Sequence, residues 1–447
     1  MIIQIDNNKD IEFLTDDSKQ IDKNGAFVLT KQNKKYLEEV KKNPALKIIS
    51  PAQCIELLGF GDKIKIIGIT GTNGKTTTAA CIYSTLLDLD KKVAMQGTRG
   101  CFINDKRSED KSLTTPPILQ TINNIKQAVE EGCEYFIMEV SSHAIEQNRI
   151  EGLDFALKIV TNVTQDHLDY HGSLDAYIAV KSSFFDDESP KLINKDDGKI
   201  RFNRKNCMTY GAEYPSTYKV VAYSLKEGVN AVIQKINKMY DFQSGLHGFF
   251  NLHNLTAAIS AVDMLGIAPM EKICEVVENF GGVEGRMEVV STDPLVIIDF
   301  AHTPDGMDKV LDALKDRKMI VVFGAGGDRD KNKRPQMGNI ASRYAKKVVV
   351  TSDNPRSEEP EAIIKDITSG IKSCESLHVE PNRKEAIKYA LSIREENEMV
   401  VILGKGDETY QEIKGQKIPF DDREVVRKLL LSKEKLDKID DTKSVKR

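Results

Sequence analysis

The sequence predicts an α/β protein of two or three domains, and three observations support this prediction. The chain has 447 residues, which is too long for a single ordinary hydrophobic core. A short apolar run, Lys65–Thr70, leads through a glycine-containing turn into a helical stretch, Thr76–Leu89, and this order opens many nucleotide-binding domains. After about Glu284 a second series of β-type runs begins. We therefore expect at least two sheets, each with its own core.

In chain order, the first 63 residues form a small opening unit, with a strand at Gly25–Leu29 and a charged helix at Lys34–Lys42. The next part should contain two more buried strands, at Tyr135–Met138 and Leu157–Val160. The last part has four β-type runs with helices between them: Val296–Ile298, Met319–Phe323, Val348–Val350 and Met399–Leu403, with helices at Pro360–Ile371 and Arg383–Ile393. This alternation predicts a parallel, doubly wound sheet with helices on both faces. We expect the charged end from about Glu434 to be frayed.

The composition argues against several classes of protein. With 64 basic and 68 acidic residues the net charge is −4, so the chain lacks the positive surplus of proteins that bind nucleic acid or anionic membranes. The seven cysteines are scattered and form no CxxC pair, which argues against a zinc site or a disulfide framework. No apolar run approaches the roughly 18 residues that span a bilayer, and the amino end lacks a signal-peptide pattern. We expect a soluble, cytoplasmic protein with reduced thiols.

The turn at Gly71–Thr77 has the features of a phosphate-binding loop. Its glycines let backbone N–H groups face a phosphate, and the following helix adds its positive dipole end. In such loops the lysine, here Lys75, meets the β- and γ-phosphates, and the next hydroxyl, Thr76, can bind Mg²⁺. The strict eight-residue pattern requires a glycine where this chain has Ile69. A glycine turn that arose by chance is the alternative, but the flanking strand and helix favour phosphate binding.

Polar residues also follow the next two expected strands. Glu139 lies at the end of one strand, and His167 follows the other. Because the carboxyl ends of parallel strands meet in one crevice, the two side chains are placed to reach the same ion. Magnesium prefers carboxylate and phosphate oxygens, so the residues alone leave the role of His167 open. Lys181, on a helix expected at Leu174–Phe185, by itself fits a solvated surface lysine.

Ten sequence blocks, in order along most of the chain, resemble the Mur ligases, which add amino acids to a cell-wall precursor. The blocks are Gly71–Thr77, Thr114–Pro116, Glu139–His143, Asp166–Gly172, Tyr177–Lys181, Asn251–Asn254, Gly285–Glu288, Asp299–Asp305, Gly326–Asp330 and Asp353–Arg356. The resemblance implies a UDP-binding unit at residues 1–63, a central ATP-binding domain at 64–284 and a Rossmann-like domain for the incoming amino acid at 285–447. It also implies an ATP-dependent ligase that works through an acyl phosphate.

The resemblance assigns roles around ATP and Mg²⁺. The expected ATP-binding residues are Gly71, Thr72, Asn73, Gly74, Lys75, Thr76, Thr77, Asn251, Arg286 and Asp299. The expected metal ligands are Thr76, Glu139, His167 and Lys181, the last as a carbamate formed with CO₂ or bicarbonate. The expected catalytic residues are Lys75, Lys181 and His302. By themselves, Asn251 and Asn254 fit caps of a helix at Leu255–Leu265, Asp299 fits a turn former and Arg286 fits an interdomain ion pair.

Two further groups of residues are expected to hold the other substrates. Those that match the site of UDP-N-acetylmuramoyl-L-alanyl-D-glutamate are Ser18, Thr114, Thr115, Ser141, Gln147 and Arg149. Those that match the amino-acid site are Arg329, Asp353, Asn354, Pro355, Arg356, Gly404 and Glu408. In the family an arginine at the place of Arg356 goes with meso-diaminopimelate, and a guanidinium can clamp the second carboxylate that lysine lacks. Asp407 stands where the family usually has histidine.

Three alternatives remain from the sequence. The first is a lysine-adding ligase of the same family, which Arg356 disfavours. The second is a folylpolyglutamate synthetase, a related ligase, which the blocks Thr114–Pro116 and Asp353–Arg356 disfavour. The third belongs to another class, a phosphate-loop switch that hydrolyses ATP without making a bond; its activity would not depend on a UDP-linked substrate. We expect a monomer whose partners are small-molecule substrates.

Overall fold

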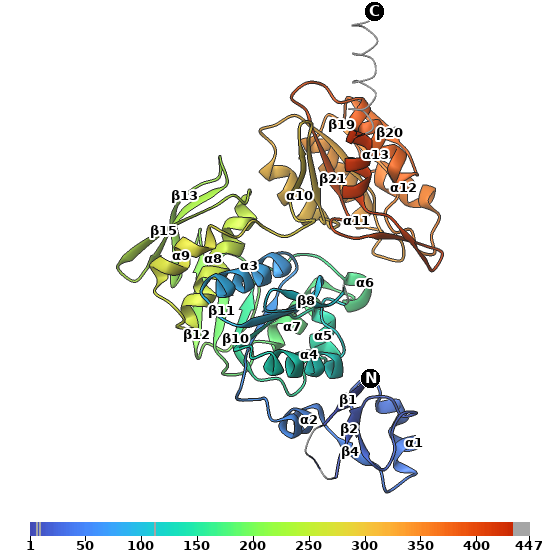
Figure 1. Cartoon of the computed structure of the whole chain (residues 1–447). Helices are drawn as coiled ribbons and strands as arrows, with labels where there is room; N and C mark the ends of the chain where they lie inside the picture. Colours follow the sequence, from blue (N-terminus) through green and yellow to red (C-terminus); the bar gives the residue numbers. More distant parts are fainter. Residues whose placement is uncertain (6–7, 9, 111–112, 432–447) are drawn as a thin grey trace, which may run out of the picture.

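The computed structural model describes residues 1–5, 8, 10–110 and 113–431. Three sheet-containing units follow one another along the molecule (Figure 1). The amino-terminal unit is dark blue, the central one runs from blue at α3 through green to yellow, and the carboxyl-terminal one is orange and red. The charged end from about Glu434 lies outside the described residues. The domain limits expected at residues 63 and 284 stay a prediction. Within the described part of the chain, no helix is both long and apolar enough to cross a membrane.

The amino-terminal unit is a four-stranded sheet in the order β1-β2-β3-β4. Its elements are β1 (Ile2–Gln4), β2 (Phe13–Thr15), β3 (Gly25–Val28), η1 (Lys34–Tyr36), α1 (Leu37–Lys41), β4 (Lys47–Ile49) and α2 (Pro51–Leu58). Strand β1 is antiparallel to β2, and the other pairs are parallel. The last helix begins at a capping box of Ser50 and Gln53, with Pro51 at its first position, a sequence that favours helix initiation.

The central unit is built on an eleven-stranded sheet in the order β15-β14-β13-β12-β11-β10-β5-β9-β6-β7-β8. Its strands are β5 (Lys65–Thr70), β6 (Val93–Gly97), β7 (Gly100–Ile103), β8 (Lys106–Glu109), β9 (Tyr135–Glu139), β10 (Phe155–Val160), β11 (Lys191–Asn194), β12 (Cys207–Gly211), β13 (Tyr218–Ser224), β14 (Val229–Lys235) and β15 (Lys238–Ser244). From β13 to β6 neighbouring strands are parallel, and both margins are antiparallel. The phosphate-loop strand β5 therefore lies inside the parallel part, where continuous apolar runs are buried on both faces.

Helices cover both faces of the central sheet. They are α3 (Lys75–Asp88), α4 (Ile118–Glu130), α5 (Ser142–Glu146), α6 (Leu168–His171), α7 (Leu174–Ser183), α8 (Phe249–Met264) and α9 (Met270–Val277). One core combines side chains of α3, α8 and α9 with one face of the sheet, and the other combines α4 and α7 with the opposite face. In Figure 1, α3, α8 and α9 lie on the side of the sheet away from α4 and α5. The second core also includes Leu14, Ala26 and Val28 of the amino-terminal sheet.

The carboxyl-terminal unit has a six-stranded sheet in the order β16-β17-β21-β18-β19-β20. Its elements are β16 (Glu288–Thr292), β17 (Leu295–Asp299), α10 (Pro304–Ala313), β18 (Met319–Phe323), α11 (Lys333–Tyr344), β19 (Lys347–Val350), α12 (Pro360–Thr368), β20 (Ser376–Val379), α13 (Arg383–Ser392), β21 (Met399–Leu403), β22 (Tyr410–Ile413) and β23 (Gln416–Pro419). Only β16 is antiparallel among these six strands. Helices α10, α11 and α12 pack on one face and α13 on the other, so the predicted doubly wound arrangement is confirmed. Strands β22 and β23 form a separate hairpin.

Two expectations from the sequence need correction. The helix expected at Leu255–Leu265 begins at Phe249, so Asn251 and Asn254 lie within its first two turns and do not precede it as caps. The four strands between Cys207 and Ser244 were not expected. Strands β12 and β13 continue the parallel part of the central sheet, and β14 and β15 extend it by an antiparallel margin. Alternate residues of β15 are buried and exposed, which is the pattern of a strand with one solvated face.

Candidate active site

A cavity of about 340 Å³ lies between the central and carboxyl-terminal units. The central unit contributes the phosphate loop, the ends of β9 and β10 and the start of α8, and the carboxyl-terminal unit contributes the segment after β17 and part of α10. The expected site residues that line it are Thr72, Asn73, Gly74, Lys75, Thr76, Thr77, Thr114, Glu139, His167, Asn251, Arg286, Asp299, His302 and Arg329. Residues up to 257 positions apart in the sequence thus meet around one space.

The phosphate loop connects β5 to α3 through two glycines with positive φ. Gly71 has a φ of 151° and Gly74 a φ of 85°. A Cβ atom at Gly71 would lie 1.9 Å from Thr161 Oγ1, and one at Gly74 would lie 2.3 Å from Asn254 Oδ1. Any larger residue would displace these neighbours, so the close approach requires glycine at both places. The loop exists in the form that the sequence predicts, with α3 beginning at Lys75.

The half-buried Lys75 and the buried Lys181 meet at the base of this loop. Lys75 Nζ donates to Gly71 O at 2.8 Å and to Thr72 O at 2.9 Å. Lys181 Nζ donates to the same Gly71 O at 2.9 Å and to Thr70 Oγ1 at 3.2 Å. Burial lowers the pKa of both amines, and for Lys181 the charge of Lys75 lowers it further. The reading of Lys181 as a solvated surface lysine is therefore wrong, because only 1% of this residue is exposed.

Oxygen donors suited to a divalent cation lie at the start of α3. Thr76 Oγ1 donates to Glu139 Oε2 at 3.0 Å, and the carboxylate also accepts from Thr98 N at 2.9 Å. Glu139 is 2% exposed. A carboxylate beside a hydroxyl, at the phosphate end of the loop, is the kind of ligand set that Mg²⁺ uses together with phosphate oxygens and water. These residues fit the expected metal. The described residues contain no group of three His, Cys, Asp or Glu side chains arranged for a metal.

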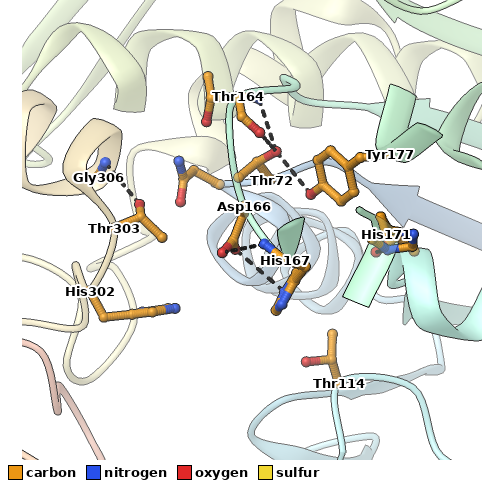
Figure 2. A network of polar contacts seen from close by, with 12 residues as sticks. Thr72, Thr114, Thr164, Asp166, His167, His171, Tyr177, His302, Thr303 and Gly306 are labelled. Carbon is orange, nitrogen blue, oxygen red and sulfur yellow. Dashed lines mark hydrogen bonds and ion pairs between the residues drawn. The ribbon is translucent and has the colours of Figure 1, made fainter. Parts of the chain in front are cut away.

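His167 lies beside a charged pair that joins the two units. Its Nε2 is 3.4 Å from Asp166 Oδ2, and Asp166 Oδ1 is 3.2 Å from Lys333 Nζ on α11. Figure 2 shows His302 pointing from the carboxyl-terminal unit toward Asp166 and His167. Burial lowers the pKa of His167 to about 4, although Asp166 opposes the shift. The His167 imidazole is therefore neutral at neutral pH, and a neutral imidazole can bind a metal.

The other side of the cavity carries the remaining residues expected to bind ATP. Asn251 Nδ2 donates to His247 O at 2.8 Å, and Asn251 Oδ1 accepts from Asn254 Nδ2 at 3.1 Å. The Arg286 guanidinium lies 4.1 Å from the centre of the Phe300 ring, a cation–π contact. Asp299 accepts from Met287 N and Ala301 N, each at 2.7 Å. This carboxylate therefore forms a turn as well as facing the cavity.

Five of the residues expected to hold the UDP-linked substrate lie in one connected region. The wholly buried Thr115 hydroxyl donates to Glu139 O at 2.9 Å and accepts from Ser141 N at 3.0 Å. Arg149 Nη1 donates to Thr115 O at 2.8 Å, and its Nη2 donates to Gln147 Oε1 at 2.6 Å. Thr114 Oγ1 is 3.1 Å from Thr98 Oγ1. Hydrogen bonds therefore fix most of these residues relative to one another.

Ser18 is not part of this region. It lies in the turn after β2 of the amino-terminal sheet and lines neither of the two cavities between the larger units. The amino-terminal unit does approach the same region through other residues. Lys31 Nζ donates to Glu146 O and Gln32 Nε2 donates to Gln147 O, each at 2.5 Å. A role of Ser18 at the uridine stays a prediction.

A second cavity of about 160 Å³ adjoins the first. It is lined by six of the seven residues expected at the amino-acid site: Arg329, Asp353, Asn354, Arg356, Gly404 and Glu408. Pro355 does not line it, and its carbonyl packs against Gly327, where an added Cβ would lie 1.9 Å away. Five residues line both cavities: Asp166, His167, Phe300, His302 and Arg329. The two spaces therefore share a wall.

Some polar groups at the second cavity are hydrogen-bonded, and one buried oxygen there is not. Asn354 Nδ2 donates to Glu408 Oε2 at 2.9 Å, and the buried Lys405 Nζ donates to the same oxygen at 2.9 Å. In contrast, Asp353 Oδ2 is buried without a hydrogen bond, and its nearest charged partner is Arg383 Nη1 at 3.9 Å. A buried oxygen that lacks a hydrogen bond can accept one from an ammonium group.

Several residues of the site were not singled out from the sequence. Asp305 Oδ2 on α10 accepts from Asn73 Nδ2 of the phosphate loop at 2.8 Å and from Thr164 Oγ1 at 3.1 Å. Lys333 pairs with Asp166 in the same way across the two units. Asp305 lies in a block already matched to the family, so only its partner was unknown. No local pattern distinguishes Lys333 from other lysines in that charged segment.

Comparisons with known proteins give a consistent result. Residues 69–262 match the model of the Mur ligase middle domain, and residues 285–406 match that of the Mur ligase, glutamate ligase domain. A protein of Wolinella succinogenes is 52% identical over 417 residues, which cover 93% of this chain and 96% of that one. A Helicobacter pylori protein is 47% identical over 433 residues, covering 94% and 96%. Both are named UDP-N-acetylmuramoyl-L-alanyl-D-glutamate–2,6-diaminopimelate ligase.

Solved structures agree. A structure with the same ligase name superimposes with a TM-score of 0.66 at 30% identity, covering 94% of this chain and 95% of that one. A folylpolyglutamate synthase of Mycobacterium tuberculosis gives a TM-score of 0.66 at 18% identity, covering 79% of this chain and 92% of that one. At that identity the second likeness concerns the fold alone.

Proposed function

The chain belongs to the Mur ligase family, and from this premise we propose that it joins meso-2,6-diaminopimelate to UDP-N-acetylmuramoyl-L-alanyl-D-glutamate at the expense of ATP. The relatives at 47–52% identity carry that activity in their names. The observation in the structure that supports the proposal best is the shared wall of the two cavities. An activated acyl group formed in the larger cavity would face an amine held in the smaller one.

The proposed reaction has two steps. The γ-carboxylate of the D-glutamyl residue attacks the γ-phosphorus of ATP, and ADP leaves with the bonding electrons, so an acyl phosphate remains. The amine of diaminopimelate then attacks the acyl carbon, loses a proton, and phosphate leaves from the tetrahedral intermediate. A free carboxylate is a poor acyl donor, and phosphorylation supplies the leaving group. Positioning and charge stabilisation carry most of such a rate enhancement.

Each part of the site has a task in this scheme. The phosphate loop would bind the phosphates through its backbone N–H groups, with Lys75 close to the β- and γ-phosphates. For this, Lys75 must exchange its contacts to Gly71 O and Thr72 O for phosphate oxygens. His302, at the shared wall, is placed to take the proton from the attacking amine. The joined units would keep water away from the acyl phosphate.

Magnesium is expected in the family, and the residues at the start of α3 fit it. Thr76 and Glu139 would hold the ion, with His167 as a third candidate on the same cavity. The metal neutralises charge on the phosphates when bound. Lys181 as a carbamate would add an anionic oxygen ligand, and its burial favours the neutral amine that reacts with CO₂. Carbamylation of Lys181 stays a proposal.

The preference for diaminopimelate rests on Arg356. Its guanidinium lines the smaller cavity and can bind a second carboxylate, which lysine does not have. A lysine-adding ligase is disfavoured because a cation would then face this arginine. Folylpolyglutamate synthetase shares the fold, but the close relatives are named for diaminopimelate. Membership of a ligase family argues against an ATPase switch.

The test is a reconstitution with the purified chain. ATP, Mg²⁺, bicarbonate and UDP-N-acetylmuramoyl-L-alanyl-D-glutamate are mixed with meso-diaminopimelate in one tube and with L-lysine in another. We expect phosphate release and a tripeptide product with diaminopimelate only. Turnover with lysine alone would refute the specificity, and phosphate release without any UDP-linked substrate would favour the ATPase switch. The cytoplasmic location and the monomeric state stay predictions.

A further inference from the structure

The β22–β23 hairpin is bound to the loop that carries Arg356. The Arg356 amide donates to Glu412 O at 3.0 Å, and the Lys414 amide donates to Arg356 O at 2.6 Å. These bonds form a parallel bridge between Arg356 and Ile413. Arg356 has a φ of +51°, which is uncommon for a residue other than glycine. The hairpin therefore holds this arginine in a backbone conformation that it would rarely adopt alone.

Two more contacts fix the same loop to β22. Glu412 N donates to Asn354 Oδ1 at 2.9 Å, and Gln411 Nε2 donates to Asp353 O at 2.8 Å. Asp353 and Asn354 line the smaller cavity, whereas Gln411 and Glu412 stand behind the loop and do not line it. The hairpin thus supports the amino-acid cavity from outside.

The side chain of Glu412 also reaches the arginine. Its Oε2 lies 3.3 Å from Arg356 Nε, while Arg356 Nη1 donates to Gly327 O at 2.7 Å. Among the described residues, Nη2 of this guanidinium donates no hydrogen bond. A guanidinium carries five N–H donors in a fixed plane, so holding two of its nitrogens sets the direction of the third. Arg356 itself lines the cavity.

This ion pair is not placed to contribute much stability. The side chains of Arg356 and Glu412 are 24% and 32% exposed, and pairs with that exposure contribute little to folding. Their value is geometric, since an arginine on a flexible stem binds a carboxylate bidentately only when its plane is fixed. A bound diamino acid with a second carboxylate would gain from that arrangement, and lysine would not.

We propose that Glu412 is a positioning residue that orients Arg356 toward the distal carboxylate of the amino-acid substrate. It thereby sets the preference for a diamino acid with two carboxylates over lysine. The inference rests on the proposed function. It adds a residue outside the cavity to those expected to contact the substrate.

The test compares Glu412→Ala and Glu412→Gln with the wild type, using kcat and KM for meso-diaminopimelate and for ATP. We expect Glu412→Ala to raise KM for diaminopimelate about tenfold, the value of one charge-assisted hydrogen bond. Its kcat and its KM for ATP should stay within about twofold of wild type. Glu412→Gln keeps an oxygen for Arg356 Nε and should recover most of the loss. Glu359→Ala is the matched control, because Glu359 pairs with Lys414 of the same hairpin at 3.2 Å.

A double-mutant cycle separates positioning from a general effect on folding. If Glu412 acts through Arg356, adding Glu412→Ala to Arg356→Ala should cause no further rise in KM for diaminopimelate. The inference would be overturned if the two substitutions raised KM for diaminopimelate additively, if Glu359→Ala raised it equally, or if Glu412→Ala left it unchanged. In each of these cases the proposed function would still stand, provided that the wild type ligates diaminopimelate. A wild-type enzyme that ligates no diaminopimelate would overturn both.

Discussion

Replacing Thr115 by valine tests whether one hydroxyl fixes the region in which Thr115 joins the backbone of Glu139 to that of Ser141. Valine has almost the same shape, so the change removes polar contacts and leaves packing nearly intact. The hydroxyl joins Glu139 O and Ser141 N at 2.9 and 3.0 Å. In Thr115→Val both backbone groups lose this partner, and Thr115 is wholly buried, so water does not replace it there.

The expected cost follows from these two groups. A buried polar group without its partner costs about 1–3 kcal/mol, so Thr115→Val should lower the free energy of unfolding by about 2–4 kcal/mol. Equilibrium urea unfolding followed by circular dichroism measures this difference. Thr115→Ser is the control, since it keeps the hydroxyl and loses only a methyl group, worth about 1 kcal/mol. If the valine variant is no less stable than the serine variant, the Thr115 hydroxyl does not organise this region.

Three further predictions concern other parts of the chain. Lys75→Ala should abolish phosphate release and leave the circular dichroism spectrum unchanged; unchanged turnover would refute the assignment of the phosphate loop. Arg383→Ala should lower the free energy of unfolding by about 3–5 kcal/mol, because it leaves the fully buried Asp422 without its partner at 2.7 Å. Thermal unfolding measures the loss. A shift of the unfolding midpoint no larger than that of a substitution at an exposed residue would contradict the prediction. Hydrogen bonds from Arg334 lower the pKa of Glu358 from 4.5 to about 2, so its contribution to stability is complete above pH 4.5 and is lost as pH falls through 2. The difference in free energy of unfolding between wild type and Glu358→Gln should therefore shrink over that pH interval. A difference that stays constant would show that the ion pair is unimportant.

Features that depend on neighbouring residues in sequence could be predicted. The apolar run of β5, two glycines and a helix-forming segment lie within 25 residues, and local rules relate each of them to the structure. The same holds for the parallel strands of the carboxyl-terminal sheet, whose apolar runs are continuous because both faces are covered. The limits of α8 were wrong because Phe249 and Phe250 begin the helix without a capping side chain.

Features that depend on distant partners could not be predicted from the residues alone. Lys181 is buried by Thr70 and Gly71, which precede it by more than 100 residues, so only the resemblance to the family distinguished it from a surface lysine. Glu412 meets Arg356 because a hairpin folds back on a loop 56 residues earlier, and neither segment shows this in its own pattern. The strands of the central sheet from Cys207 onward were missed although β14 and β15 alternate buried and exposed residues, so here a local signal was present and was not used.

The contacts that join the two larger units also bear on how fast ATP is hydrolysed without amide-bond formation. Asp305 accepts hydrogen bonds from Asn73 and Thr164, and Lys333 pairs with Asp166. Of these residues, Asn73 and Asp166 also line the larger cavity. A nucleotide on the central unit alone would face an incomplete enclosure. We therefore expect ATP hydrolysis without amide-bond formation to be slow until the carboxyl-terminal unit covers the nucleotide. ATP would then be consumed mainly when an acceptor amine is also close to it.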